Sequence, residues 1–509
     1  IIANHYIALF AARFAKQNRK MLMRNIENLT LDQVSDFGVA SLVTRVANDN
    51  NNAQQLIVAF FQMILPSPIM AILSIFLTIQ LSPSLALIPL FTILIFAFAI
   101  TLTLFKSLPY ILKVQKKLDR MVLVLRERFI GAKIIRTFDN SKKERDKFND
   151  IAQDYTDNYI TINKKFALLS PMAFSLMSVI ITLIIFFGAR KVLNNTLEIG
   201  SITAIVEYSL TTIAALIMSS MVLVQMPKAV VSIDRIEEIL DVTSEIKDKE
   251  GLKDNSYYED ILKQNPVSLT FDNVCFRYKG AEKQILKNIS FSIKAGERFA
   301  IVGATGSGKS TIAKVLLRLN DIEDGKILIN NYNSLDLPLT CLRNQISYIP
   351  QKAYIFSGTI KDNFRFANKN MTDEEMVKIA KIAQSYDFID SLPDKFDSFV
   401  AQGGTNFSGG QKQRLSIARA LSKDSNIYLF DDSFSALDYA TDAKLRKELK
   451  TFLKDKITII IAQRLNTITD ADKIIVLKDG EITGMGTHEE LLKNNHEYIE
   501  LAKSQGILE

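Results

Sequence analysis

Cysteine is scarce in this sequence: among 509 residues only Cys275 and Cys341 are present. They lie far apart and form no CxxC pair, so they indicate neither a metal site nor a disulfide framework. We expect both to be buried free thiols in a reducing compartment. A strong charge of one sign is also missing, because 62 basic against 55 acidic residues leave a net charge of +7. The basic residues lie beside apolar segments, which indicates membrane topology and argues against nucleic-acid binding.

The sequence starts with IIANHY, without an initiator methionine and already apolar, and no signal peptide is expected in it. We therefore expect a fragment that begins inside a membrane helix. The length predicts about three domains, at roughly 150 residues for each. Hydrophobic residues make up 48% and charged residues 23%, which predicts a membrane part joined to a soluble part.

The first half contains four apolar stretches long enough to cross a bilayer, which takes about 20 helical residues. They cover residues 56–81, 85–105, 166–189 and 202–224, and residues 1–15 resemble the end of a fifth span. Four such stretches argue against buried core helices of a soluble protein. The long connection between the second and third stretches carries 15 lysines and arginines, whereas the connections on the other side are short. The basic side stays in the cytoplasm, so the last span leads into the cytoplasm.

The second span is predicted to extend far beyond the bilayer. Residues 84 to about 130 contain no glycine, and a helix over this stretch would measure about 70 Å. The hydrocarbon core takes about 30 Å of that length, so a long cytoplasmic extension is expected. We predict short helices at the tips, near residues 131–138 and 37–50, that contact a soluble domain. Glu207, in the last span, is a candidate for substrate contact, although a side chain reaching the outer interface fits its position equally well.

A phosphate-binding loop is the clearest motif of the second half. Charged and polar residues at 241–266 predict a linker between a membrane domain at 1–240 and a second domain at 267–509. The second domain contains GATGSGKS between an apolar run and a helical pattern, which is the strand–loop–helix context that such a loop requires. Glycines let backbone N–H groups surround phosphate oxygens, and the helix N-terminus favours an anion. The residues predicted to bind ATP here are Gly303, Thr305, Gly306, Ser307, Gly308, Lys309, Ser310 and Thr311.

Charged side chains in and after this loop predict the use of ATP with Mg²⁺. Lys309 would reach the β and γ phosphates, and Ser310 would ligate Mg²⁺. About 120 residues later, the apolar strand at 427–430 ends in Asp431, and an aspartate at that strand end can hold Mg²⁺ through water. The pattern therefore predicts a P-loop NTPase.

A second helix N-terminus that can face an anion lies in the sequence FSGGQ, where a helix begins with Ser408, Gly409, Gly410 and Gln411. One nucleotide cannot easily occupy both helix starts within one chain. A head-to-tail pair of domains, each ATP held between the phosphate loop of one chain and the FSGGQ of the other, would resolve this.

The motifs together resemble ABC transporters of the exporter type, along essentially the whole chain: Walker A GATGSGKST, Q-loop YIPQ, signature FSGGQ, Walker B IYLFDD and D-loop SALD. The resemblance implies a multidomain fold, with an all-α transmembrane helical bundle followed by an α/β P-loop ATPase domain. It implies a half-transporter in the cell membrane that pairs with a second half and exports an amphipathic drug, lipid or peptide. Such halves have six spans; five are found here, the first of them partial, so the first span and part of the second would be missing.

The resemblance also implies roles for single residues. Tyr278 would stack on adenine, Gln351 would ligate Mg²⁺ and sense the membrane domain, and Asp438 is the D-loop aspartate. Ser408–Gln411 would contact the partner's ATP.

Two positions depart from the family pattern. Asp432 stands where the family has a glutamate as general base, and its carboxylate falls short by more than about 1 Å, a misplacement that can cost about 10²-fold in rate. Gln463 stands where the family has the switch histidine, and an amide can neither gain nor lose a proton in acid–base work. Both changes predict the degenerate-site half of a heterodimeric exporter, whose partner carries the consensus residues.

The sequence leaves some alternatives to a heterodimeric exporter open and argues against others. A homodimer that turns over slowly on Asp432 and a regulated ABC channel stay open. A soluble ABC ATPase acting on DNA or ribosomes is argued against by the spans. An importer is less expected, because importers usually place membrane and ATPase parts on separate chains.

Overall fold

The computed structural model describes residues 2–263 and 267–508, and it divides the chain into two compact units, Ile1–Thr243 and Ser244–Glu509. The division lies close to the domain boundary predicted at residue 240. Residues 264–266 of the predicted linker lie outside the described residues. Each unit has its own buried cores, and we describe the two separately.

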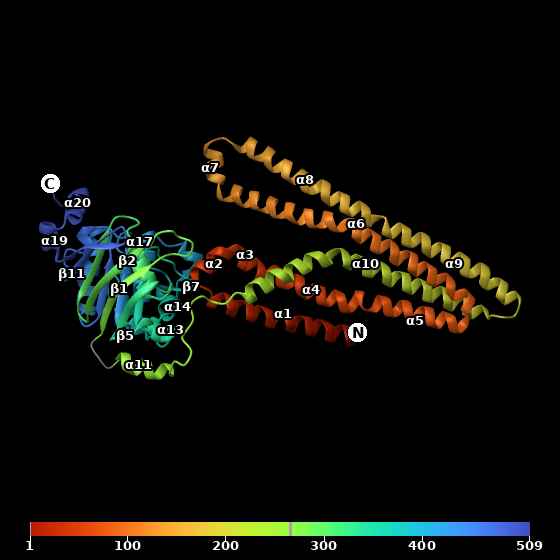
Figure 1. Ribbon diagram of the computed structural model, residues 1–509, viewed down its shortest axis with the longest axis horizontal. Helices are drawn as coiled ribbons and strands as arrows, with labels where there is room; N and C mark the ends of the chain where they lie inside the picture. Colours follow the sequence, from red (N-terminus) through yellow and green to blue (C-terminus); the bar gives the residue numbers. More distant parts are fainter. Residues whose placement is uncertain (1, 264–266, 509) are drawn as a thin grey trace. The chain divides into compact units, whose positions relative to one another are not determined.

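The first unit consists of helices in all of its described residues apart from short connections (Figure 1). Short π-helical segments, Arg45–Asp49 and Phe60–Ile64, join neighbouring helices into one continuous rod. The α-helices are α1 (Ile2–Asn28), α2 (Leu31–Phe37), α3 (Val39–Thr44), α4 (Asn50–Ala59), α5 (Pro66–Leu81), α6 (Pro83–Ile130), α7 (Ala132–Thr137), α8 (Ser141–Ala167), α9 (Leu169–Leu193) and α10 (Ile199–Asp241).

Four helical rods of the described residues are long and apolar enough to cross a membrane: Val39–Leu81, Pro83–Ile130, Ser141–Leu193 and Ile199–Ser220. Three of the four predicted spans lie within these rods, and the fourth, predicted at 202–224, overlaps the rod Ile199–Ser220. Helix α1 is not among the helices long and apolar enough to cross a membrane, so the partial fifth span at residues 1–15 stays a prediction. Large apolar side chains such as Ile72, Phe98 and Phe105 point outward from these rods, as expected where lipid is the solvent.

Helix α6 runs for 48 residues, or about 70 Å, and continues through Pro89 and Pro109. The short helix α7 connects it to α8, as predicted for residues 131–138. The short helix between α1 and the rod that starts at Val39 is α2, which ends because Gly38 adopts a positive φ of 75°. Most of the predicted tip at 37–50 instead belongs to the rod that starts at Val39, so the predicted position of this tip was wrong.

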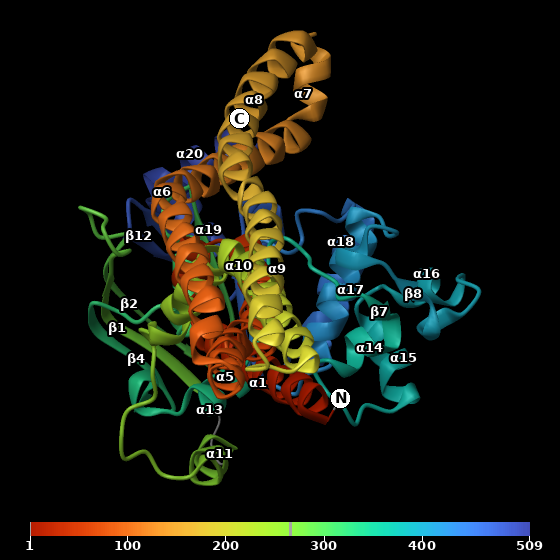
Figure 2. The same cartoon turned by 90° about the vertical axis from the view of Figure 1, so that its right-hand side faces the viewer.

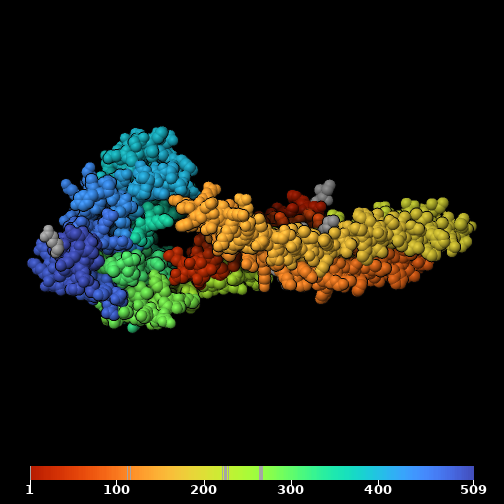
Figure 3. Space-filling model, turned by 90° about the horizontal axis from the view of Figure 1, so that it is seen from above, coloured from red at the N-terminus to blue at the C-terminus, as the bar shows by residue number. Residues whose placement is uncertain are grey.

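Two apolar clusters hold this unit together. One joins α6, α9 and α10 around Phe96, Ile184 and Ile205; the other joins α1, α3, α4 and α10 around Leu22, Leu42 and Ile239. Figure 2 shows α6 and α9 side by side, in agreement with the close pairing of their backbones. In the space-filling view, α6, α8 and α9 cover one long side of the unit (Figure 3).

The second unit is built on a six-stranded sheet of order β12-β11-β3-β10-β9-β6. All neighbours in it are parallel except β11 and β12. A four-stranded antiparallel sheet has the order β2-β1-β4-β5, and β7 pairs with β8. The strands are β1 (Ser268–Phe276), β2 (Leu286–Lys294), β3 (Arg298–Gly303), β4 (Asp324–Ile329), β5 (Tyr332–Asn333), β6 (Ile346–Ile349), β7 (Gly358–Thr359), β8 (Phe399–Val400), β9 (Ile427–Asp431), β10 (Ile457–Ile461), β11 (Lys473–Lys478) and β12 (Glu481–Gly486).

The six-stranded sheet is covered on both faces, which explains why its inner strands β3, β10 and β9 are almost continuously apolar. Alternate residues of β3 enter different cores. Phe299 and Ile301 face the antiparallel sheet and α12; Ala300 and Val302 face the cluster formed with α15, α17, α18 and α20. The helices of this unit are α11 (Asn255–Lys263), α12 (Lys309–Leu316), α13 (Leu339–Asn344), α14 (Ile360–Arg365), α15 (Asp373–Ile382), α16 (Tyr386–Asp390), α17 (Gly409–Leu421), α18 (Tyr439–Phe452), α19 (His488–Asn494) and α20 (His496–Ser504).

Part of the segment predicted as a linker is ordered in the second unit. Helix α11 lies within residues 241–266, and its Leu262 is buried in the core beneath the antiparallel sheet. Cys275 and Cys341 are both free and buried, as predicted from their spacing.

Candidate nucleotide site

The predicted phosphate loop connects β3 to α12, and close contacts within the chain require glycine at two of its positions, Gly303 and Gly308. A Cβ atom on Gly303 would lie 2.2 Å from the carbonyl oxygen of Leu477. A Cβ atom on Gly308 would lie 2.9 Å from the Leu286 side chain, and Gly308 has a left-handed φ of 103°. Both positions therefore exclude any larger residue. The loop ends at Lys309, where α12 begins.

A cavity of about 400 Å³ opens at this loop. It collects residues from the phosphate loop, from the ends of β9 and β10, and from the segments after β1 and β6. Most of the predicted site residues meet here, although Gly303 and Ser307 lie beneath the lining. The lining residues are Tyr278, Ile285, Thr305, Gly306, Gly308, Lys309, Ser310, Thr311, Gln351, Asp431, Asp432, Ile461 and Gln463.

Lys309 lies at the centre of this site. Its Nζ donates hydrogen bonds to the carbonyl oxygens of Gly303 at 2.8 Å and Ala304 at 2.7 Å. Burial lowers the pKa of Lys309, and the nearby carboxylates of Asp432 and Asp431 oppose that shift. The ammonium group is thus held against the loop, within reach of an anion that the loop surrounds.

Asp431 ends β9 and connects the two sides of the cavity. Ser310 Oγ donates to its Oδ1 at 3.2 Å, and the Tyr348 hydroxyl donates to its Oδ2 at 3.1 Å. Burial raises the pKa of the Asp431 carboxyl, and the two hydrogen bonds oppose this. Burial and the charge of Asp431 also raise the pKa of Tyr348, so this phenol keeps its proton.

The oxygen atoms of this site fit Mg²⁺, which prefers hard oxygen ligands and keeps several waters. A hydroxyl on Ser310 and a carboxylate on Asp431 already approach each other closely enough to share one small ion. Gln351 lines the same cavity and supplies a further carbonyl oxygen. Next to them, the buried Ser307 Oγ has no hydrogen-bond partner among the described residues, but Ser307 does not line the cavity.

Asp432 follows in a left-handed backbone conformation, with φ of 46°. Its N–H donates to the carbonyl of Ile461 at 2.8 Å, and its Oδ2 accepts a hydrogen bond of 2.9 Å from Gln351 Nε2. Only 8% of Asp432 is exposed. The short carboxylate is therefore held toward Gln351. Gln463 lines the same cavity, just after β10.

Tyr278 lies at the edge of the cavity beside α12. Its hydroxyl accepts a hydrogen bond from Lys314 Nζ at 3.1 Å and lies 3.3 Å from Thr311 Oγ1. Its ring packs edge-on against Phe276, with centroids 4.8 Å apart. These contacts, together with the Lys314 ammonium 5.1 Å from the ring centroid, hold the ring in one place at the edge of the cavity.

The signature residues do not line this cavity. Ser408 caps the N-terminus of α17: its hydroxyl accepts from the Gln411 N–H, and the Gln411 side chain accepts from the Ser408 N–H. A Cβ on Gly409 would have no neighbour within 4 Å, and one on Gly410 would meet only ordinary contact at 3.6 Å. This helix start is thus open to the outside.

Asp438 is also outside the cavity. It is exposed and caps α18 by accepting a hydrogen bond of 3.0 Å from the Thr441 N–H. Backbone and side-chain hydrogen bonds to Thr441 lower the pKa of Asp438, so it carries its charge at neutral pH.

Tyr348 is a site residue that the motifs did not predict. It belongs to β6, which pairs in parallel with β9, so its hydroxyl meets Asp431 at the carboxyl edge of the sheet. The only sequence signal is its position three residues before Gln351 in the YIPQ motif.

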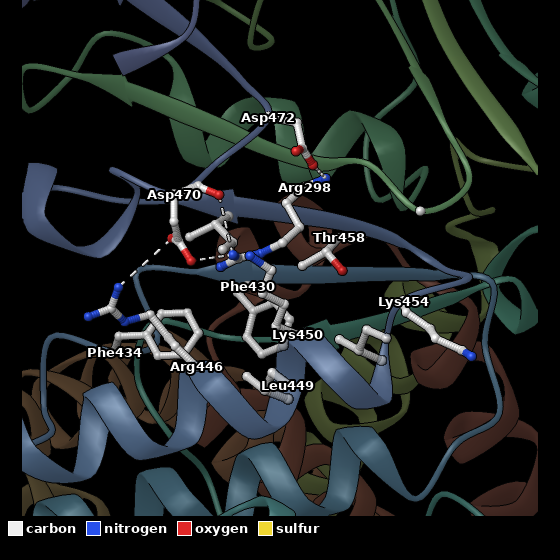
Figure 4. Close-up of a pocket in the computed structure, with 13 residues that line it drawn as sticks. Arg298, Phe430, Phe434, Arg446, Leu449, Lys450, Lys454, Thr458, Asp470 and Asp472 are labelled. Carbon is white, nitrogen blue, oxygen red and sulfur yellow. Dashed lines mark hydrogen bonds and ion pairs between the residues drawn. The ribbon is translucent and has the colours of Figure 1, made fainter. Parts of the chain in front are cut away.

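A second cavity, of about 190 Å³, lies between α18 and the sheet (Figure 4). Arg298 and Arg446 point toward Asp470 there, above an apolar floor that includes Phe430 and Leu449. None of the predicted site residues lines it, and its arginine side chains are paired with aspartates. The first cavity is therefore the candidate nucleotide site.

A glycine-rich loop between a parallel strand and a helix, with a buried lysine, a hydroxyl and a strand-end aspartate around one cavity, defines a P-loop nucleotide-binding domain. In this chain it follows a unit of membrane-crossing helices.

Comparisons with known proteins agree with this class. Residues 286–435 match the family described as ABC transporter, and residues 1–216 match the ABC transporter transmembrane region. The ABC transporter ATP-binding protein YfiB of Bacillus subtilis (strain 168) is 33% identical over 505 residues, which cover 99% of this chain and 86% of YfiB. A protein of Rickettsia bellii (strain RML369-C), named for export ATP-binding/permease function, is 32% identical over 512 residues, with coverage of 99% and 86%.

Solved structures agree as well. A bacterial Atm1-family ABC exporter with ATP bound has a TM-score of 0.83 at 24% identity, covering 97% of this chain and 86% of that chain; this likeness concerns the fold. The chain belongs to the ABC transporter family. It is a multi-pass membrane protein with a cytoplasmic ATPase domain, so the predicted fold class and membrane location are confirmed.

Proposed function

We propose that this chain is the ATP-binding and permease subunit of an exporter, in which ATP binding and hydrolysis drive outward movement of an amphipathic substrate. The fusion of a membrane-crossing unit to an ATPase domain supports this function. The Rickettsia relative, which is named for export, and the ATP-bound exporter of similar fold point in the same direction.

ATP is proposed to bind in the cavity at the phosphate loop. Backbone N–H groups of the loop and the N-terminus of α12 surround the phosphates, while the Lys309 ammonium moves from the Gly303 and Ala304 carbonyls to the β and γ phosphates. Tyr278 supports the adenine. Ser310, Asp431 and Gln351 hold Mg²⁺, which neutralises charge on the phosphate oxygens.

A partner chain is proposed to complete each site. The N-terminus of α17 also favours an anion, but the residues that line the ATP cavity do not include it. A side chain at Gly409 would meet no atom of its own chain within 4 Å. The packing of this chain therefore does not require a glycine there, and we propose that the glycine makes room for a molecule from outside the chain. The occupant proposed here is the nucleotide bound to the partner's phosphate loop, with Asp438 beside the shared boundary.

We propose that the partner is a different half-transporter and that this chain holds the degenerate site. The observation that carries this proposal is the Asp432 carboxylate, which is short, almost fully buried and hydrogen-bonded to Gln351 at 2.9 Å. A general base must lie within hydrogen-bond reach of the attacking water. Gln463, in the same cavity, has no proton to exchange. Hydrolysis is then expected mainly at the site built on the partner's phosphate loop and this chain's Ser408–Gln411.

The test is affinity purification of the tagged chain from its native membranes, followed by mass spectrometry. We expect a second half-transporter with glutamate and histidine at the positions of Asp432 and Gln463. Recovery of this chain alone as a dimer would replace the heterodimer with a slow homodimer. A purified complex that conducts ions without ATPase stimulation by any transported compound would favour the channel instead.

A further inference from the structure

The side chain of Gln505, close to the chain end, binds the main chain next to the nucleotide cavity. Its Nε2 donates to the carbonyl oxygen of Gln463 at 2.8 Å, and its Oε1 accepts from the N–H of Leu465 at 2.8 Å. In an extended segment the carbonyl of one residue and the N–H two residues later point to the same side. The amide of Gln505 therefore pairs with this segment as a neighbouring strand would.

The segment in question, residues 462–465, is called here the switch segment. It leaves β10 between the ends of β3 and β9, because Ala462 N–H donates to Ile301 and Asp432 N–H donates to Ile461. The phosphate loop follows β3, and Asp431 ends β9. Of the switch segment, Gln463 lines the cavity together with Lys309 and the two aspartates, whereas Ala462 and Leu465 are buried in the core of the unit.

Gln505 is held rigidly by the end of α20. Gly506, with φ of 66°, follows it; the Gly506 N–H donates to Lys503 and the Ile507 N–H donates to Ala502, both at 3.0 Å. This pair of bonds is the Schellman arrangement that ends a helix in a left-handed residue. Gln505 is consequently the last residue before a tight reversal, and its backbone has little freedom.

Helix α20 is in turn anchored in the core of the second unit. Tyr498 and Ala502 are fully buried, and the Tyr498 hydroxyl lies 2.7 Å from His488 Nδ1. At the other end of the helix, Asn495 accepts from the Tyr498 N–H at 2.8 Å and donates to the Thr483 carbonyl at 3.0 Å. The helix is thereby fixed to the edge of the six-stranded sheet and carries Gln505 to the switch segment.

We propose that Gln505 is a positioning residue for nucleotide binding, which holds the switch segment so that Gln463 faces the γ-phosphate. The inference rests on the proposed binding of ATP in this cavity. It gives the last helix a role in distinguishing ATP from ADP, because the groups that hold adenine and the inner phosphates lie on the phosphate loop and Tyr278, away from Gln505.

The test uses the full chain in detergent, with three variants. Gln505→Ala removes both hydrogen bonds. Gln505→Glu keeps an acceptor for the Leu465 N–H but loses the donor to Gln463. Lys503→Ala changes an exposed residue of the same helix and is the matched control. Affinities for fluorescent ATP and ADP analogues are measured with Mg²⁺, together with hydrogen exchange of the Leu465 amide.

With Gln505→Ala we expect ATP affinity to fall about 3- to 10-fold, the size expected when Gln463 is no longer held to make one hydrogen bond to the γ-phosphate, while ADP affinity stays unchanged. The Leu465 amide should exchange faster in this variant and remain protected with Gln505→Glu. Equal losses for ATP and ADP, or exchange and affinities like those of Lys503→Ala, would overturn the proposal. If the unmodified chain binds neither analogue, the proposed ATP site fails, whereas the exchange of Leu465 still reports on the contact with Gln505.

Discussion

The two helix N-termini that can face an anion, those of α12 and α17, differ in what surrounds them. At α12, a side chain on Gly303 or Gly308 would collide with atoms of the same chain at 2.2 and 2.9 Å. At α17, a side chain on Gly409 would meet nothing within 4 Å. The N-terminus of α12 therefore borders a cavity lined by this chain, whereas the N-terminus of α17 is capped by Ser408 but is not enclosed by other residues of this chain. The difference supports the proposal that the phosphate loop of this chain holds one nucleotide, while its α17 contacts the nucleotide held by a partner.

The largest effect expected from this comparison comes from Gly409→Val. In the assembled two-chain transporter it should lower ATP turnover about 100-fold, because the branched side chain displaces the partner's nucleotide from α17. The affinity of the isolated chain for ATP should not change. A matching loss of ATP affinity in the isolated chain would show that α17 serves the chain's own cavity, and the contrast between the two helix starts would disappear.

Lys309→Ala tests the other helix start. It should weaken ATP binding by the isolated chain about 10- to 100-fold, since a hydrogen bond to a charged group contributes roughly 1.5–3 kcal/mol. Binding of a fluorescent ATP analogue measures this, with Lys326→Ala, which changes an exposed lysine of the same domain, as control. Unchanged affinity would show that the phosphate loop does not bind the nucleotide.

Asp432→Glu tests whether the short side chain at this position limits ATP hydrolysis in the cavity next to α12. The longer side chain brings a carboxylate toward the attacking water, but Gln463 remains, so hydrolysis by the purified chain should rise by less than about 10-fold. Changing Gln463 to histidine in the same protein should raise it further. Full turnover from the single substitution would mean that the switch residue matters little here.

The smallest effect concerns stability. Burial raises the pKa of Asp431, so its ionised form opposes folding, and the contribution of this group is favourable only below the pKa of the folded state. Asp431→Asn should therefore raise the melting temperature of the full chain at neutral pH, by about 2–4 °C if the gain is about 1 kcal/mol. The advantage should shrink as the pH falls toward that pKa. Scanning calorimetry at several pH values measures it, and a lower melting temperature at neutral pH would contradict the assignment.

The helix starts and the cavity can be predicted from sequence because their signals are local. Glycines, an apolar strand and a helical pattern lie within a few positions of Lys309, and Asp431 directly follows its strand. The same holds for the four spans, where length and apolar composition suffice.

The features missed from sequence depend on contacts between distant parts of the chain. Tyr348 reaches Asp431 only because β6 pairs with β9, which no local pattern specifies. Gln505 contacts residues 40 and 42 positions away in the chain. Most of α11 is polar, so its composition predicts a linker, whereas its order depends on one buried face at Leu262. The tip predicted at 37–50 lies too far along the chain, because the positive φ that lets Gly38 end α2 has no signal beyond a single glycine.

We propose, in short, a chain that binds ATP by itself but needs a different chain for rapid hydrolysis. The decisive measurement is ATP binding and ATP hydrolysis by the purified chain alone, compared with hydrolysis after its half-transporter partner is added. We predict saturable binding, almost no turnover alone and rapid turnover in the pair. Turnover by the lone chain equal to that of the pair would contradict this proposal.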